Sequence, residues 1–193
     1  MEDYKMPQGM FRERRKYEIL DGKIYYMAGA SSNHNAIKVN ISRIFANYLR
    51  GKPCRLFVDG EDVHFNKKDT AMPDVMIVCN KDIIKKNGIY GAPDLTVEIL
   101  SPSTAENDIG YKKDLYEKYG VKEYWIISQA ERSVQVYLLK DGVYKLDKLY
   151  HAYSEDDIEV LTDDEKSEII KEFKTSLFDD LIISVEEIFE NVE

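Results

Sequence analysis

Residues 93–128 read PDLTVEILSPSTAENDIGYKKDLYEKYGVKEYWIIS, and this stretch decides the fold. It begins with a nearly continuous apolar run, DLTVEIL, and ends with another, KEYWIIS, while the pattern between them is helical over about 104–119. Ser103-x-x-Glu106 matches a capping box at the start of this helix, and Gly120 would end it. The upstream run PDVMIVC, at 73–79, has the same apolar character. Such runs are typical of strands covered on both faces.

The flanking patterns complete the predicted architecture. Asp21-Gly22 and Asp141-Gly142 each separate two β-rich runs, which predicts hairpins over 15–29 and 133–150. Ser31, Ser32 or Asn33 would cap a helix that runs to about Gly51, and a short strand and a helix are expected within 176–192. The order of helix, central strands, helix and strand indicates a three-layer α/β sandwich around a mixed sheet.

The composition is that of a single globular domain over residues 1–193. Hydrophobic residues make up 44% of the chain and charged residues 33%. No apolar run approaches the roughly 18 residues that a membrane span needs, and the N-terminus lacks the apolar core of a signal peptide. We therefore expect a protein without a membrane partner.

The two cysteines, Cys54 and Cys79, form neither a CxxC pair nor a Cys/His zinc pattern. Both stand among apolar residues, so they are expected to pack as small hydrophobic side chains without a disulfide framework. This cysteine usage indicates a cytoplasmic location.

The formal net charge of −9 argues at first against a nucleic-acid ligand, because phosphate contacts need Lys and Arg. Residues 155–193, however, carry 15 acidic and 3 basic side chains, a net of −12, which leaves +3 for residues 1–154. The basic cluster Arg12, Arg14, Arg15 and Lys16 permits phosphate binding, although such a cluster is commonly just a solvated face.

Two carboxylates stand where apolar side chains would be expected. Asp74 opens the run PDVMIVC, and Glu98 lies inside DLTVEIL between Val97 and Ile99. A buried ionised carboxylate needs a cation, a metal or strong hydrogen-bond donors. If the two strands are neighbours, Asp74 and Glu98 could share one hard divalent ion such as Mg²⁺.

The helix at 104–119 supplies a cation for these carboxylates. On a 100° wheel Lys112 falls at the centre of the stripe formed by Leu115, Tyr116 and Tyr119, whereas Lys113 lies at its edge. A lysine within an apolar face is seldom there for packing. Asp94, the other aspartate that follows a proline, lies four residues from Glu98, roughly 13 Å along a strand. That is too far to share a metal, so Asp94 is expected to start its strand.

From the residues alone, the trio Asp74, Glu98 and Lys112 has two open explanations. It is either a catalytic site or a buried structural salt bridge, because both settings perturb charged groups.

A resemblance bears on this choice. The segments PDVMIV, PDLTVEILSPST and DIGYKKDLYEKYGVKEYWII resemble those of the Uma-two family, endonuclease-like proteins of the PD-(D/E)xK nuclease superfamily. The similarity runs from YEILDG near residue 17, through His34, to the terminal strand and helix. It implies a restriction-endonuclease-like fold in which Asp74 is the motif aspartate and Glu98 the motif glutamate. The usual lysine position holds Leu100, and the resemblance implies that the lysine has migrated to the following helix, where the wheel independently selects Lys112.

The implied activity is hydrolysis of phosphodiester bonds in nucleic acid, with DNA as the expected substrate. Asp74, Glu98 and the Ile99 carbonyl would hold Mg²⁺, with Mn²⁺ as a substitute, and Lys112 would stabilise the transition state. His34 and Glu18 are candidate accessory residues, although His34 could equally serve the start of its helix. His64 is expected to be exposed.

Two other functions stay open beside the nuclease. The missing lysine at Leu100 and the acidic tail favour a catalytically silent module that binds nucleic acid or protein, and the two carboxylates could also serve a hydrolase of another kind. A homodimer would suit the cutting of both strands of a duplex. That argument rests only on what cleavage of both strands requires, and no particular residue supports it.

Overall fold

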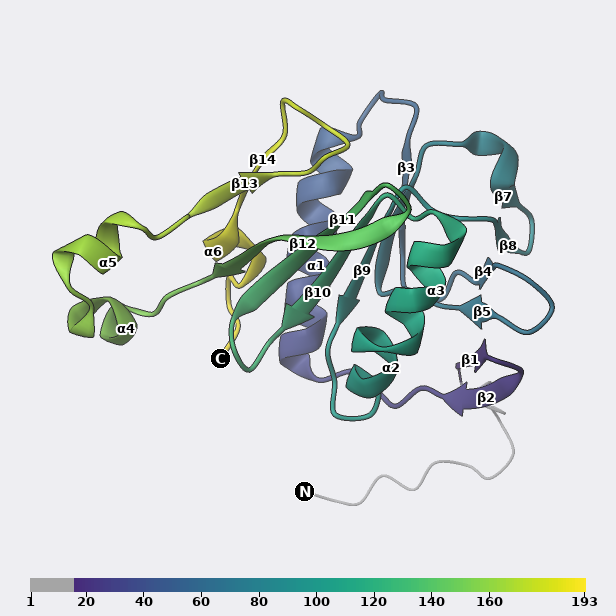
Figure 1. Ribbon diagram of the computed structural model, residues 1–193, viewed down its shortest axis with the longest axis horizontal. Helices are drawn as coiled ribbons and strands as arrows, with labels where there is room; N and C mark the ends of the chain where they lie inside the picture. The colour runs from purple at the N-terminus through teal and green to yellow at the C-terminus, as the bar shows by residue number, and fades with distance from the viewer. Residues whose placement is uncertain (1–15) are drawn as a thin grey trace, which may run out of the picture.

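The computed structural model of the protein describes residues 16–193, and Figure 1 shows how the helices and strands are arranged. Of the predicted basic cluster, Arg12, Arg14 and Arg15 lie outside these residues.

The predicted mixed central sheet is present and has six strands, in the order β12-β11-β10-β9-β6-β3. β9 runs parallel to β10, whereas the other neighbours in the sheet are antiparallel. The strands in this order are β12 (Val143–His151), β11 (Ser133–Lys140), β10 (Glu123–Ser128), β9 (Leu95–Ile99), β6 (Val75–Val78) and β3 (Arg55–Val58).

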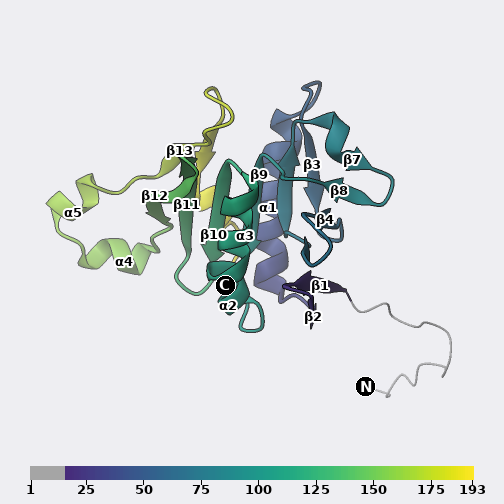
Figure 2. The same ribbon diagram turned by 45° about the vertical axis from the view of Figure 1, so that its right-hand side comes forward.

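The two faces of this sheet carry different layers, as Figures 1 and 2 show. α1 (Ser32–Tyr48) packs on one face through a buried cluster that includes Ile41, Val97 and Trp125. α3 (Tyr111–Tyr119) packs on the opposite face, where Tyr116 and Tyr124 belong to a second cluster. The alternation of side chains along β6, β9 and β10 explains why these strands read as continuous apolar runs, because both of their faces are covered.

A second sheet lies on the α3 side of the molecule, and only the hairpin at one of its edges was predicted. Its Leu20 and Ala71 pack with α3, and its Val63 and Ile89 pack against β6. Strands of two or three residues are too short to give a periodic sequence pattern, which explains why the prediction missed them. The order is β2 (Lys23–Tyr26), β1 (Tyr17–Leu20), β5 (Thr70–Ala71), β4 (Val63–His64), β8 (Gly88–Tyr90) and β7 (Ile84–Lys85). A 3₁₀ turn (Lys81–Ile83) precedes β7.

Both predicted hairpins are confirmed, since β1 pairs with β2 and β11 pairs with β12. In each turn the aspartate and the glycine have positive φ angles, 50° and 75° at Asp21-Gly22 and 57° and 78° at Asp141-Gly142. These angles define the type I′ turn that fits the twist of two antiparallel strands.

The first helix is capped by Ser31, whose side chain accepts a hydrogen bond from the His34 N–H. The second helix differs from the prediction, because α2 (Ala105–Ile109) and α3 are separated at Gly110. A Cβ atom at Gly110 would lie 2.9 Å from the Glu106 carbonyl oxygen, so the chain bends where only glycine fits. The Ser103–Glu106 capping box does not form, because α2 begins after Thr104 without a side-chain cap.

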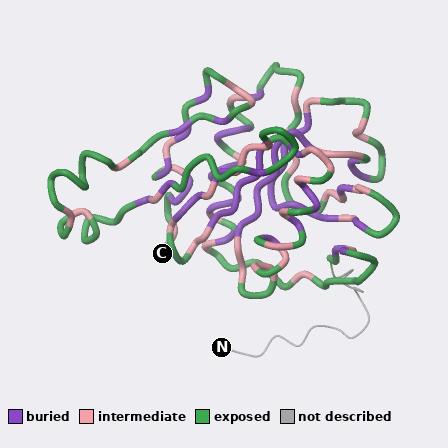
Figure 3. Tube along the Cα trace, in the orientation of Figure 1, coloured by how far each residue is buried: buried purple, intermediate pink, exposed green. Residues whose placement is uncertain are grey.

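The acidic tail contains the predicted strand and helix, β14 (Ile182–Ser184) and α6 (Val185–Ile188). β13 (Glu172–Lys174) pairs with β14, and both belong to the layer of α1. α4 (Glu155–Val160) and α5 (Asp163–Ser167) extend away from the sheets in Figure 1 and are exposed along most of their length in Figure 3.

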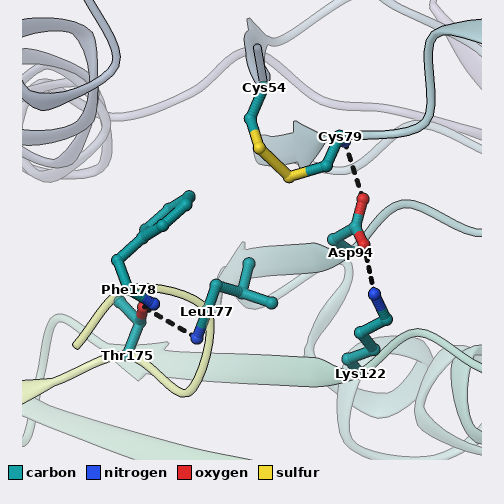
Figure 4. Close-up of a disulfide and its surroundings, with 7 residues drawn as sticks. All are labelled: Cys54, Cys79, Asp94, Lys122, Thr175, Leu177 and Phe178. Carbon is teal, nitrogen blue, oxygen red and sulfur yellow. Dashed lines mark hydrogen bonds and ion pairs between the residues drawn. A yellow bond between two sulfur atoms is a disulfide. The ribbon is translucent and has the colours of Figure 1, made fainter. Parts of the chain in front are cut away.

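The prediction for the cysteines is wrong, because Cys54 and Cys79 form a disulfide (Figure 4). β3 and β6 pair with Arg55 opposite Val78. Cys54, which precedes Arg55, therefore lies opposite Cys79, which follows Val78. Sequence patterns did not indicate that these two strands are neighbours, and so the pairing was missed. The argument from unpaired cysteines to a cytoplasmic location loses its basis.

Candidate active site

A pocket of about 710 Å³ opens where β6 begins and β9 ends. Its walls come from the segment 27–31 between β2 and α1, from the loop 101–104 after β9, and from α1 and α3. Eight of the lining residues are charged or ionisable: Lys16, His34, Lys38, Asp59, Asp74, Glu98, Asp108 and Lys112. The three predicted catalytic residues therefore line one pocket.

Asp74 and Glu98 meet because their strands are neighbours. β6 and β9 pair antiparallel with Val75 opposite Val97, so continuing the register by one residue sets Asp74 opposite Glu98. Directly opposed residues of an antiparallel pair have their side chains on the same face of the sheet. The prediction required the strands of Asp74 and Glu98 to be neighbours, and they are.

The Asp74 carboxylate is held by groups from two layers. Its Oδ1 lies 2.9 Å from His34 Nε2 on α1, and its Oδ2 accepts a hydrogen bond of 2.9 Å from the Ile99 N–H. Lys38 Nζ, also on α1, lies 3.9 Å from Oδ1. His34, the predicted accessory residue, thus contacts the site directly while its own N–H serves the cap at Ser31.

Lys112 lies at the centre of a buried ionic cluster. Its Nζ is 2.6 Å from Glu98 Oε1, 2.9 Å from Glu18 Oε1 and 3.1 Å from Asp108 Oδ1. The Lys112 residue is 1% exposed, and the three acidic residues are no more than 3% exposed. The helical wheel placed Lys112 correctly, and Glu18, which the sequence suggested as an accessory acid, reaches the cluster from β1.

The cluster has an excess of acidic groups over bases. One ammonium group faces three carboxylates, so full ionisation would leave a net charge of −2 away from water. Burial raises the pKa of Glu98 well above its ordinary value; Lys112 opposes this shift, and Asp108, Asp74 and Glu18 add to it. Burial likewise raises the pKa of Asp108, again against the effect of Lys112. The carboxylates therefore favour a proton or an additional cation.

The carboxylates raise the pKa of Lys112 well above its ordinary value. Burial alone would lower this pKa, but Glu18, Glu98, Tyr116 and Asp108 together outweigh that effect, and so the ammonium form is retained. Tyr116, one helical turn further along α3, donates a hydrogen bond of 2.6 Å to Glu98 Oε1. Oε1 of Glu98 therefore receives two donors, which fixes the orientation of the carboxylate.

A second, more exposed ionic group lies at the mouth of the pocket. Asp59 is bonded by Lys16 at 2.8 Å and by Lys38 at 3.3 Å. The pKa of Asp59 is lowered because its bonds to Lys16 and Lys38 outweigh the effect of burial. Lys38 is 8% exposed, because it extends to Asp59 and Asp74 and not into the apolar core.

Asp94 and His64, which were not expected to bind the metal, lie outside the pocket. Asp94 precedes β9 and accepts bonds of 2.7 Å from the Cys79 N–H and from Lys122 Nζ (Figure 4). His64 was expected to be exposed, but it is half-buried, because its ring contacts Thr70 and the Asn87 carbonyl. Asp108 was not among the predicted site residues, although its position four residues before Lys112 on a helical pattern could have signalled an ion pair.

Within residues 16–193, no three His, Cys, Asp or Glu side chains are arranged as a ready metal cage. The predicted ligand set needs only two side chains, Asp74 and Glu98, with a main-chain carbonyl. Within a strand the N–H and C=O of one residue point to the same neighbour, so the Ile99 carbonyl faces the side on which the Ile99 N–H meets Asp74. These oxygen donors, beside uncompensated carboxylate charge, fit a hard divalent cation.

The fold and the pocket define a protein of the restriction-endonuclease-like class. In solved structures, 90% of the chain matches 89% of a protein from Anabaena variabilis described as a "putative nuclease belonging to DUF820", with a TM-score of 0.67 and 20% identity. That likeness shows the shared fold.

The chain belongs to the Uma2 family, described as "Putative restriction endonuclease", whose model matches residues 1–164. Two relatives come from Synechocystis sp., both named as uncharacterized proteins. One, slr1290, is 34% identical over 67% of this chain and 70% of its own length; the other, sll1609, is 29% identical over 63% and 71%. Family membership supports a nuclease. No helix within residues 16–193 is long and apolar enough to cross a membrane.

Proposed function

We propose that the protein is a metal-dependent nuclease that hydrolyses phosphodiester bonds of DNA at the pocket of Asp74, Glu98 and Lys112. The observation that carries the proposal is the opposition of Asp74 and Glu98 across β6 and β9, beside a buried cluster with more carboxylates than cations. Such a pair is suited to a hard divalent ion and has little use in a purely apolar core.

Asp74, Glu98 and the Ile99 carbonyl would hold Mg²⁺ or Mn²⁺. When bound, such an ion lowers the pKa of a water molecule and neutralises charge on the scissile phosphate. His34 and the Ile99 N–H orient Asp74, and Tyr116 and Lys112 orient Glu98. The ammonium group of Lys112 contributes fixed positive charge beside the phosphate, where negative charge increases in the transition state.

Hydrolysis of labelled single-stranded and duplex DNA, with and without Mg²⁺, tests the proposal. Asp74→Asn should reduce the rate by about 100-fold or more, because charge stabilisation by a metal is worth several kcal/mol. Asp94→Asn is the matched control, since Asp94 also follows a proline but bonds Lys122 outside the pocket. Equal cleavage by wild type and Asp74→Asn would contradict the proposal.

The contacts of Lys112 favour a second candidate, a nuclease-fold module without catalysis that binds nucleic acid or protein. The Lys112 ammonium group contacts three carboxylates, so its donors are already engaged. Calorimetric titration with Mg²⁺ separates the two candidates. Binding near one ion per chain that is lost in both Asp74→Ala and Glu98→Ala supports the nuclease, whereas no binding by a folded wild type supports the silent module.

The homodimer was expected only because two subunits would suit the cleavage of both strands of a duplex, and it stays a prediction. Sedimentation velocity of the full chain tests it directly.

A further inference from the structure

The hairpin of β1 and β2 has two faces of opposite character. Cross-strand pairing joins Glu18 to Tyr25 and Leu20 to Lys23, and this face turns inward, where Glu18 bonds Lys112. The other face carries the pairs Tyr17–Tyr26 and Ile19–Ile24. We call these four side chains the hairpin face.

The hairpin face is apolar and open to solvent. Tyr26 is 64% exposed, Ile24 56% and Tyr17 47%, and every residue of β2 is exposed. The Tyr17 and Tyr26 rings contact one another edge to face with centroids 6.3 Å apart. β2 is also the outer strand of its sheet, so its outer edge has no strand partner within residues 16–193. A contiguous exposed apolar surface of this kind commonly marks a binding site.

This surface lies one residue pair away from the pocket. The hydrogen bond from the Met27 N–H to the Lys16 carbonyl extends the hairpin by one pair beyond Tyr17–Tyr26, and both Lys16 and Met27 line the pocket. Because side chains alternate along a strand, this pair lies on the inward face, so a strand of nucleic acid that leaves the pocket would pass round the end of the hairpin to place its bases over the two tyrosines.

The charges around the hairpin suit a phosphate backbone. Lys23 is exposed beside the turn, and the Gly22 N–H bonds the Lys68 carbonyl, which brings the exposed Lys67 and Lys68 to the same end. Lys16, at the other end, is exposed and bonds Asp59. A basic track with exposed aromatic rings is the combination by which proteins bind single strands, because every base has a face that can stack.

We propose that the hairpin face stacks unpaired bases, so that the substrate is single-stranded or locally unpaired nucleic acid. The proposal rests on the proposed nuclease function for the backbone path through the pocket. It commits to nucleic acid and not to a second copy of the chain or another protein, because the face adjoins the candidate active site and is flanked by lysines.

Fluorescence anisotropy of the full chain tests this proposal, with a labelled mixed-sequence single-stranded oligodeoxynucleotide at low salt in EDTA. Tyr26→Ala should weaken binding about 5- to 100-fold, the range for loss of one stacked base. Tyr26→Phe should bind like wild type, since the ring is kept. Tyr90→Ala is the matched control, because Tyr90 is 49% exposed on β8, toward the other end of the same sheet.

A probe of the same length with abasic nucleotides shows whether bases are the ligand. Wild type should bind it more weakly, and Tyr26→Ala should cause no further loss. Equal affinity of wild type and Tyr26→Ala, an equal loss on the abasic probe, or no binding by wild type would overturn the proposal.

Sedimentation velocity identifies a competing occupant. A wild-type dimer that becomes monomeric in Tyr26→Ala, with unchanged oligonucleotide affinity, would make the hairpin face a subunit interface and overturn the proposal. Because binding is measured without hydrolysis, a protein that binds but does not cleave removes only the proposed function. One that cleaves but ignores Tyr26→Ala removes only this inference.

Discussion

Lys112 Nζ and Glu98 Oε1 lie 2.6 Å apart, and neither residue is more than 3% exposed. Lys112 lies on α3 and Glu98 on β9, and only the loop after β9 and α2 separate these two elements in the chain. The contact therefore ties the helical layer to the central sheet at the pocket, and Glu18 joins the second sheet to the same ammonium group. The candidate catalytic residues are also structural ones.

Lys112→Met should destabilise the protein by about 3–5 kcal/mol, the usual cost of leaving buried charges without their partner. The remaining carboxylates would have higher pKa values in the folded state than in the unfolded state. Protonation then favours folding, so the loss should grow as the pH rises toward and through those pKa values. Urea unfolding at mildly acidic and neutral pH measures it.

Lys113→Met is the control for that variant. Lys113 lies beside Lys112 in sequence, but its Nζ lies over the Tyr137 ring at 4.1 Å and forms no ion pair within residues 16–193. A change within about 1 kcal/mol is expected for this partly exposed cation. Equal losses in both variants would show that the buried cluster is not what makes Lys112 important.

The site residues that could be predicted are charged residues at positions where the sequence pattern requires apolar ones. Asp74 and Glu98 stood out because their runs are apolar, and Lys112 stood out on the wheel. Asp108 was missed although it lies four residues before Lys112 on the same helical stripe, and Lys38 was missed because it is buried beside Asp59, which only the tertiary structure places nearby. Strand adjacency was equally invisible: β3 beside β6 creates the Cys54–Cys79 disulfide, and β4, β5 and β7 are too short to leave a pattern.

The pH dependence of metal binding follows from Glu98. Its pKa is raised well above the ordinary glutamate value, chiefly by burial. Since a metal binds the carboxylate form, affinity for Mn²⁺ should rise with pH through this raised pKa and be weak below it. Lys112 lowers the pKa of Glu98, so Lys112→Met should move the rise in affinity to higher pH in any variant that stays folded. Calorimetric titrations over a pH series measure the midpoint, and a midpoint at the ordinary glutamate pKa would contradict the assignment.

The disulfide should contribute stability without affecting the site. Cys79 follows the end of β6, whereas Asp74 precedes its beginning. The two cysteines are 25 residues apart, for which the loop-entropy model gives about 3 kcal/mol. Adding a reductant should lower the free energy of unfolding by about that amount and leave Mn²⁺ affinity unchanged. The double variant Cys54→Ala, Cys79→Ala should be insensitive to reductant; a reductant-dependent loss of metal binding in wild type alone would show that the bridge also shapes the pocket.

His34 allows the orienting contact to be separated from the ligands. Its Nε2 lies 2.9 Å from Asp74 Oδ1, while the cap of α1 uses only its backbone N–H. His34→Ala should therefore keep the helix and the fold but weaken Mn²⁺ binding by about 10- to 100-fold, the usual effect of removing a partner that orients a ligand. His64→Ala is the control, because His64 contacts Thr70 and Asn87 outside the pocket and should bind the metal like wild type. Unchanged affinity in His34→Ala would mean that the Ile99 N–H alone is enough to orient Asp74, and His34 would then act only at the start of α1.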